Sequence, residues 1–158
     1  MDKLAMGPVT MCLSKITLAA GTTTTISNTG TTTFLIKGVP YTKAAMTNAA
    51  VPVVDISRGS IAFRPISANQ GTVFLVGFDS GGNVRVGQGE IRALDSAGAF
   101  IVKPQLPTLP ATVCPVGKIT VKAGATAVGT WTFGTNNLSS VTGLVYTFED
   151  VVSEQERP

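Results

Sequence analysis

The sequence reads TVFLVGF at residues 72–78, DSGGN at 79–83 and VRVGQGEI at 84–91. The first run is rich in β-branched and aromatic residues, which favour strands. The third run alternates apolar and polar residues more regularly. Between them, Asp, Gly and Asn supply the side chains and backbone freedom that a tight turn requires. The three pieces predict a β-hairpin whose first arm is more buried than its second.

Similar patterns occur on both sides of this hairpin. Residues 15–18 and 31–36 are strand candidates, with turns at 20–21 and 28–30, and strand character resumes at 114–133. The threonine run at 22–25 is either a strand or a linker, and its continuity with Ile26 favours a strand. No segment keeps apolar residues at helical spacing for three turns. We therefore expect an all-β chain.

Two distant segments of the chain resemble each other. Residues 10–21 and 112–124 both read T-x-C followed by K-I-T-[LV]-x-A-G, with one residue inserted after the second cysteine. Two copies are too few for a solenoid, which needs at least three stacked units. We interpret them as corresponding strands of an antiparallel β-sandwich. Chance similarity between two threonine-rich β segments is the alternative.

The length of 158 residues predicts one domain, 1–158, because such a chain buries enough surface for an independent core. Within it, residues 1–13 are expected to form an extended N-terminal arm, since Gly7-Pro8 opposes regular structure. Residues 103–110 contain three prolines and predict an extended connection, or alternatively a ligand for a proline-binding partner. The charged tail at 153–158 is expected to fray.

Charge is scarce in this chain. Charged residues make up 13% of the sequence and the net charge is +3, without a basic cluster. That pattern predicts neither nucleic-acid binding nor attachment to a membrane surface. Apolar runs are too short for a membrane helix, and the N-terminus lacks the pattern of a signal peptide. The absence of histidine removes the commonest general base and metal ligand.

Few groups remain that could perform chemistry. Glu90 and Asp95 flank a short turn and are the best pair for a carboxylate active site, although the aromatic residues that bind sugars are scarce. Asp79, Gly81 and Asn83 have the spacing of a calcium loop, but such a loop needs further ligands and a bidentate Glu at its end, so a hairpin turn is the favoured explanation. We expect no enzyme activity, no cofactor and no metal.

The aromatic and sulfur-containing residues are expected to serve the core. Trp131 and Phe133 alternate at a strand end, which favours anchoring of a hairpin over a ligand platform. Cys12 and Cys114 lack both the C-x-x-C spacing and the accompanying histidine of zinc or redox sites. We expect two free, buried thiols in a protein made in a reducing cytoplasm.

Four segments, taken in order, resemble small virion proteins of tailed bacteriophages that are best described as capsid decoration, or cement, proteins. These segments span residues 34–43, 68–89, 109–119 and 131–138. The resemblance implies a non-enzymatic β-sandwich, jelly-roll-like, on the capsid surface of the virion, in a protein made in the bacterial host cytoplasm. Its implied partners are the major capsid protein and other copies of itself. A tail-fibre or receptor-binding β module is the alternative.

The sequence also suggests how such contacts would form. Threonine-rich strands with few charges leave sheet edges open to pairing, so we expect a homo-oligomer, with a trimer favoured. An extended arm can reach a neighbouring subunit. We expect the capsid and subunit contacts at apolar residues along this arm and the strand that follows: Leu4, Met6, Val9, Met11, Leu13 and Ile16.

Overall fold

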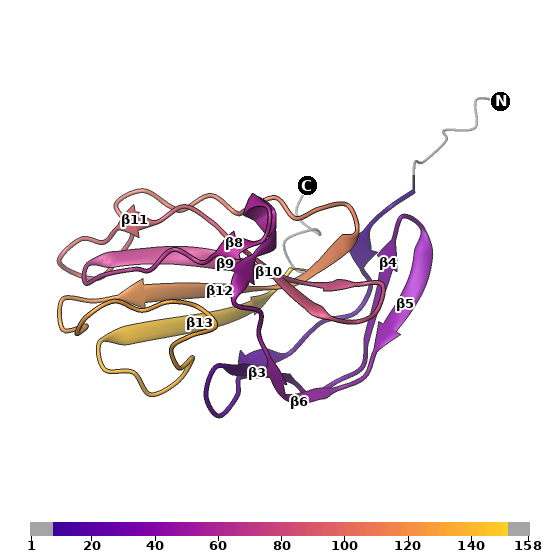
Figure 1. Cartoon of the computed structure of the whole chain (residues 1–158), viewed down its shortest axis with the longest axis horizontal. Coiled ribbons are helices and arrows are strands. Elements are labelled where there is room, and N and C mark those ends of the chain that lie inside the picture. Colours follow the sequence, from indigo (N-terminus) through magenta and orange to yellow (C-terminus); the bar gives the residue numbers. More distant parts are fainter. Residues whose placement is uncertain (1–7, 152–158) are drawn as a thin grey trace.

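The computed structural model describes residues 8–151, which form antiparallel β-sheets and no α-helix (Figure 1). The all-β prediction is confirmed, and the arrangement is consistent with a β-sandwich. The jelly-roll connectivity is not confirmed by the strand order. Within residues 8–151, no helix has the length and hydropathy needed to cross a bilayer.

One layer is a five-stranded sheet. Its main strand order is β10-β9-β12-β13, and the short strand β11 also pairs with β9. Figure 1 shows β9, β12 and β13 side by side on the left of the view. All pairs in this sheet are antiparallel. Its strands are β9 (Gln70–Asp79), β10 (Val84–Gln88), β11 (Arg92–Ala93), β12 (Val113–Ala123) and β13 (Leu144–Asp150).

The other layer consists of two three-stranded sheets, with orders β1-β4-β5 and β2-β3-β6. A small hairpin, β7-β8, encloses the 3₁₀ turn η1 and lies beside β10. The bounds are β1 (Met11–Cys12), β2 (Leu18–Ala20), β3 (Thr25–Asn28), β4 (Thr32–Ile36), β5 (Val39–Lys43), β6 (Met46–Ala50), β7 (Val54–Asp55), η1 (Ile56–Arg58) and β8 (Ile61–Ala62).

The central hairpin forms as the sequence predicts. Val84 pairs with Phe78, and the register continues to Gln88 opposite Phe74. In the turn, the Asp79 carboxylate accepts hydrogen bonds from the backbone N–H groups of Gly81 and Asn83, both at 2.9 Å. Burial raises the pKa of this carboxyl, but hydrogen bonds from Asn83, Arg85 and Gly81 outweigh burial and lower the pKa below its usual value.

The inner residues of β9 are buried on both faces of the sheet, which explains why this arm is the more apolar one. On the inner face, the Phe74 ring stacks on Phe133 with centroids 4.5 Å apart. On the outer face, the proline-rich segment crosses the hairpin and has no regular secondary structure of its own. Its Leu109 side chain lies so close to Gly87 that an added Cβ there would collide with it.

Aromatic rings join the two layers. Phe34 of β4 lies 5.7 Å from Phe78 of β9, measured between ring centroids. Trp131 forms an isolated bridge with Ile66 and donates its indole N–H to the Asn137 carbonyl at 2.8 Å. Both Trp131 and Phe133 are buried, so their assignment to the core is confirmed.

The two similar segments face each other across the core. In the second copy, residues 113–123 form the single strand β12, whereas the first copy is divided between β1 and β2. Gly117 of the second copy provides the space in which Ile16 and Leu18 of the first copy pack. Each copy ends at a glycine: the Gly21 N–H bonds to the Thr25 carbonyl, and the Gly124 N–H to the Gly143 carbonyl.

Three expectations about local structure need correction. Residues 22–24 form the turn between β2 and β3 and not a strand, because the Gly21–Thr25 bond closes the chain there. The expected strand at 15–18 begins only at Leu18. In the expected arm, Met11–Cys12 pairs with β4, so residues 8–13 lie against a sheet. Residues 1–7 and the tail at 153–158 lie outside the described residues.

The close crossing of the proline-rich segment can be tested at Gly89. A Cβ at this position would lie 2.4 Å from the Gln105 carbonyl oxygen and 2.8 Å from Val73 Cγ1. We expect Gly89→Ala to lower the free energy of unfolding by about 1–3 kcal/mol, because the crossing segment must move. Urea denaturation measures this change.

Gly30→Ala is the matched control, because an added Cβ at Gly30 has no neighbour within 4 Å. We expect this variant to change the free energy of unfolding by less than about 1 kcal/mol. Equal stability of Gly89→Ala and the unmodified protein would contradict the close crossing.

Candidate functional site

The outer face of the β1-β4-β5 sheet presents apolar side chains in register. Met11 pairs with Leu35, and Leu35 pairs with Pro40, so these three residues form one row across the sheet. Residues paired across antiparallel strands point to the same side. Their sequence neighbours Cys12 and Phe34 point inward and are buried. The row therefore lies on the solvent side.

Two further side chains extend this row. Leu13 donates its N–H to the Thr33 carbonyl, which places Leu13 two residues beyond Met11 on the same side of the chain. Val9 accepts a hydrogen bond from Gly38 at the other end of β1. Leu13 is 50% exposed and Val9 is 36% exposed. We call this surface the outer apolar face; it consists of Val9, Met11, Leu13, Leu35 and Pro40.

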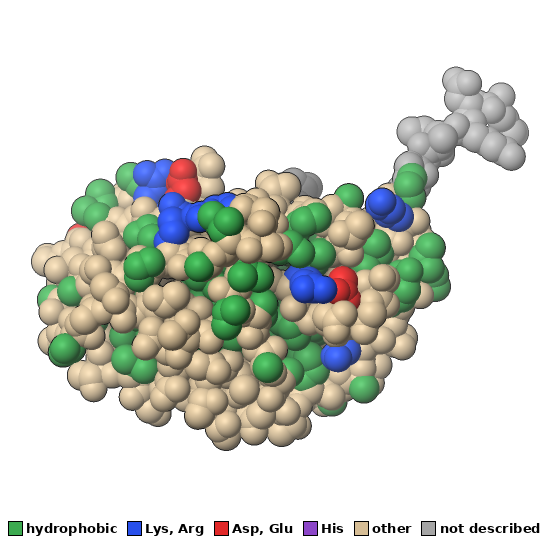
Figure 2. Space-filling model, viewed as in Figure 1, with side chains coloured by type: hydrophobic (Ala, Val, Ile, Leu, Met, Phe, Trp, Pro, Cys, Tyr) green, Lys and Arg blue, Asp and Glu red, His purple; other side chains and the backbone are tan. Residues whose placement is uncertain are grey.

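Charged side chains are sparse over the molecular surface (Figure 2). The view shows hydrophobic side chains at its right-hand end, where Figure 1 places β4 and β5. Lys37, at the turn between those strands, is exposed next to the outer apolar face. The desolvation cost of covering this face is therefore low compared with that of a charged surface.

The residues that the sequence suggested as capsid and subunit contacts do not all lie on one surface. Val9, Met11 and Leu13 all lie on the outer apolar face. Ile16 is only 4% exposed and packs in the core, so its side chain is not part of this surface. Leu4 and Met6 lie outside the described residues.

Two members of the outer apolar face, Leu35 and Pro40, were not identified from the sequence. The alternation around Phe34 and Ile36 was the available signal for Leu35, because one of the two sides of that strand had to face solvent. Pro40 joins the face only through its pairing with Leu35, which the sequence does not specify.

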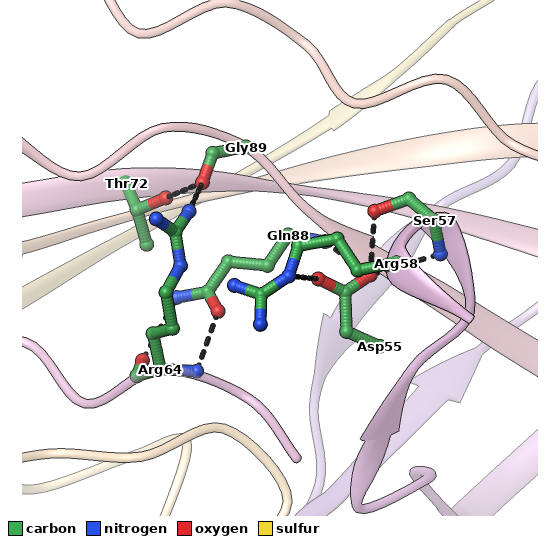
Figure 3. A network of polar contacts seen from close by, with 7 residues as sticks. All are labelled: Asp55, Ser57, Arg58, Arg64, Thr72, Gln88 and Gly89. Atoms are coloured by element: carbon green, nitrogen blue, oxygen red, sulfur yellow. Dashed lines mark hydrogen bonds and ion pairs between the residues drawn. The ribbon is translucent and has the colours of Figure 1, made fainter. Parts of the chain in front are cut away.

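A buried polar network is centred on Asp55, which is fully buried (Figure 3). Its Oδ1 accepts hydrogen bonds from the Ser57 N–H at 2.9 Å, the Ser57 hydroxyl at 2.6 Å and the Gln88 N–H at 3.2 Å. Its Oδ2 forms an ion pair with Arg58 Nε at 3.6 Å. Asp55 therefore links the η1 turn to β10 through hydrogen bonds.

Gln88 continues this network toward Arg64. The Gln88 side chain accepts the Arg64 backbone N–H at 2.8 Å and donates to the Arg64 carbonyl at 2.9 Å. The Arg64 guanidinium and the Thr72 hydroxyl both donate to the Gly89 carbonyl, at 3.0 and 3.1 Å. These contacts satisfy buried backbone groups of irregular segments, which is a structural role.

The candidate catalytic carboxylates have separate local partners. Asp95 accepts the N–H groups of Ala97 and Ala99, both at 2.9 Å, within its own turn. Glu90 forms an ion pair with Arg92. Among residues 8–151, no three or more His, Cys, Asp or Glu residues gather in a way that could hold a metal. Asp95 is therefore explained by its own turn, and Glu90 by its ion pair with Arg92.

Both cysteines are free and buried, as expected. Burial, with a smaller contribution from the nearby Cys12, raises the pKa of the Cys114 thiol to about 12. Burial also raises the pKa of Cys12, although a hydrogen bond to the backbone of Ser14 opposes it. Neither thiol has the lowered pKa that reactive cysteines need.

Comparison with known proteins found no matching family model, no similar curated protein and no similar solved structure. Assignment of a role to this chain therefore depends on its own residues. Its most distinctive surface is the outer apolar face, whereas the Asp55 network stabilises the fold.

The structural role of Asp55 can be tested by Asp55→Ala. Removal of the carboxylate leaves the buried N–H groups of Ser57 and Gln88 without their acceptor. We expect the free energy of unfolding to fall by about 2–3 kcal/mol. Asp95→Ala also removes an acceptor of two backbone N–H groups, but in an exposed turn, and we expect a loss near 1 kcal/mol. Equal losses in chemical denaturation would contradict the buried network.

Thiol burial can be tested by alkylation at pH 8. A thiol with a pKa of about 12 has roughly one molecule in ten thousand as thiolate at this pH, so native Cys114 should stay unlabelled. We expect no label on the native protein within minutes and two labels in denaturant, as measured by intact mass. Rapid native labelling would contradict burial, and unlabelled denatured protein without reductant would reveal a cross-link.

Proposed function

We propose that this chain is a non-enzymatic virion protein of a tailed bacteriophage, which binds the outside of the assembled capsid and stabilises it. The observation that carries this proposal is the outer apolar face, with its in-register row Met11, Leu35 and Pro40. The ordered resemblance to capsid decoration proteins supports the same role. The proposed partner is the major capsid protein.

The chemistry of this face suits a protein interface. Contiguous apolar side chains on a soluble protein commonly mark an interaction site. The cores of protein interfaces are depleted in charged residues, and their rims are polar. On this sheet the threonines Thr33 and Thr42 form the neighbouring row, and Lys37 lies at the border. A rigid sheet also loses little conformational entropy when it is covered.

Sheet edges support the proposal that the chain acts as a homo-oligomer, with a trimer favoured. In the described part of the chain, β5 and β6 each end a sheet of the other layer. Exposed edges of this kind pair readily with another chain unless charges or bulges protect them. Neighbouring copies that pair in this way would place several outer apolar faces on one capsid at once, which raises the effective affinity.

Stabilisation would follow from mass action. A protein that binds the assembled shell and not free subunits favours assembly by RT ln(1 + [L]/Kd). At a hundredfold excess over Kd this term is about 2.7 kcal/mol for each site. A shell has many equivalent sites, so a modest affinity at each one suffices to resist rupture.

The proposal is tested on capsid shells assembled with and without the protein. We expect the full chain to raise the temperature at which shells rupture. Leu13→Glu places a charge on the outer apolar face at a half-exposed position, and we expect at least tenfold weaker shell binding. Val128→Glu is the matched control, because Val128 is 91% exposed and lies away from β1, β4 and β5.

Equal rupture temperatures with and without the full chain would overturn the stabilising role. If Leu13→Glu binds shells as tightly as Val128→Glu does, the outer apolar face is not the contact surface. Sedimentation of the free protein tests the oligomeric state, and a monomer at micromolar concentration would contradict a stable trimer.

A further inference from the structure

A groove runs along the outer face of the other layer, between the proline-rich segment and β13. Its floor is β12, whose residues Lys118, Thr120 and Lys122 point away from the core, since Ile119 and Val121 between them are buried. The cavity has a volume of about 480 Å³. It is lined by Val73, Phe100, Lys103, Pro104, Leu106, Lys118, Thr120, Lys122, Thr147 and Glu149.

Positive charge is concentrated in this groove. Residues 8–151 contain six lysines, and three of them line it. Lys118 forms an ion pair with Glu149 at 3.2 Å. The Lys122 ammonium lies 5.0 Å from the centroid of the Phe100 ring. Among the described residues, neither Lys103 nor Lys122 has a carboxylate within ion-pair distance, so the groove keeps two uncompensated ammonium groups.

The edge of β13 borders this groove. In the described part of the chain, β13 pairs only with β12, through a continuous register from Gly117–Asp150 to Ala123–Leu144. Val145 is 60% exposed, and Thr147 is exposed on the same side of the strand. The stretch from Leu144 to Phe148 contains no lysine and no proline, the residues that commonly block strand addition.

From this geometry we infer that the β13 edge and the lysine groove together bind an extended acidic segment of a partner protein, which adds to the sheet as a further strand. Its backbone would pair with the open edge of β13, as in other strand-addition complexes. Adjacent strands lie about 4.8 Å apart, so alternate carboxylates of the added strand would face the lysine side chains from roughly two strands away. A lysine side chain of the groove and a glutamate side chain of the added strand are together long enough to meet over β13.

A polypeptide fits these features better than a nucleic acid does. An open strand edge presents both N–H and C=O groups, whereas a phosphate backbone only accepts hydrogen bonds. Glu149 is paired with Lys118, so the carboxylates of the added strand would face Lys103 and Lys122. The wall formed by Phe100, Pro104 and Leu106 offers contact to apolar side chains between the carboxylates.

This inference is independent of the proposed capsid role. The groove lies on the outer face of one layer, and the outer apolar face belongs to the other layer. If both surfaces are used, a single copy can connect two partner chains without any contribution from oligomerisation. That arrangement is what a protein that holds neighbouring subunits together requires.

The probe is a fluorescein-labelled peptide that alternates Glu and Thr, measured by fluorescence anisotropy with the full chain at low salt. We expect saturable binding that weakens as salt increases, because the contacts include exposed ion pairs. The variant with Lys103→Gln and Lys122→Gln should bind at least tenfold more weakly. A variant with Lys15→Gln and Lys37→Gln is the matched control and should bind as the unmodified chain does, because both of these lysines are exposed outside the groove.

Hydrogen exchange provides the second measurement. Saturating peptide should slow the exchange of alternate amides between Leu144 and Phe148, because an added strand bonds to them. The inference is overturned if the two groove substitutions leave the affinity unchanged, or if exchange along β13 does not slow. It is also overturned if a single-stranded RNA of equal length binds more tightly than the peptide.

Discussion

The structure depends on the covering of β9 from both sides. On its inner face Phe74 packs against Phe133 and Trp131, and its outer face lies under the proline-rich segment. A strand with two apolar faces is stable only where both are removed from water. Glycines at 87 and 89 make the outer covering possible, because any larger side chain there would hold the segment away.

This covering is confined to one part of the sandwich and therefore determines which surfaces remain open. The crossing segment lies over β9 and β10 but leaves the outer side of β12 and β13 exposed as a groove. In the other layer, Pro40 is exposed, and Met11 and Leu35 in the same row are half-buried. With 13% charged residues, the chain has few charges to place on either surface. The outer apolar face is apolar, whereas the groove combines apolar and threonine side chains with three lysines and Glu149.

Sequence patterns within a short stretch correctly predicted the strands that pair with a neighbour close to them in the sequence. The hairpin of β9 and β10 was predicted with its turn, because the alternation and the Asp-Gly-Asn chemistry lie within twenty residues of each other. The core roles of Trp131 and Phe133 followed from their alternation, and those of both cysteines from the missing spacing and histidine of a zinc or redox site. The threonine run at 22–25 was misassigned, because β propensity does not reveal that Gly21 closes a turn onto Thr25.

The sequence by itself determined the all-β class, the central hairpin and the low charge of the surface, since these follow from periodicity and composition. It also indicated Val9, Met11 and Leu13 as contact candidates, but it grouped them with Ile16, which is buried. Only the tertiary structure showed that β1 pairs with β4, which brings Leu35 and Pro40 into the same row. It alone brought Lys103 beside Lys118 and Lys122. Pairings between distant strands depend on the packing of whole layers, and no local pattern encodes them.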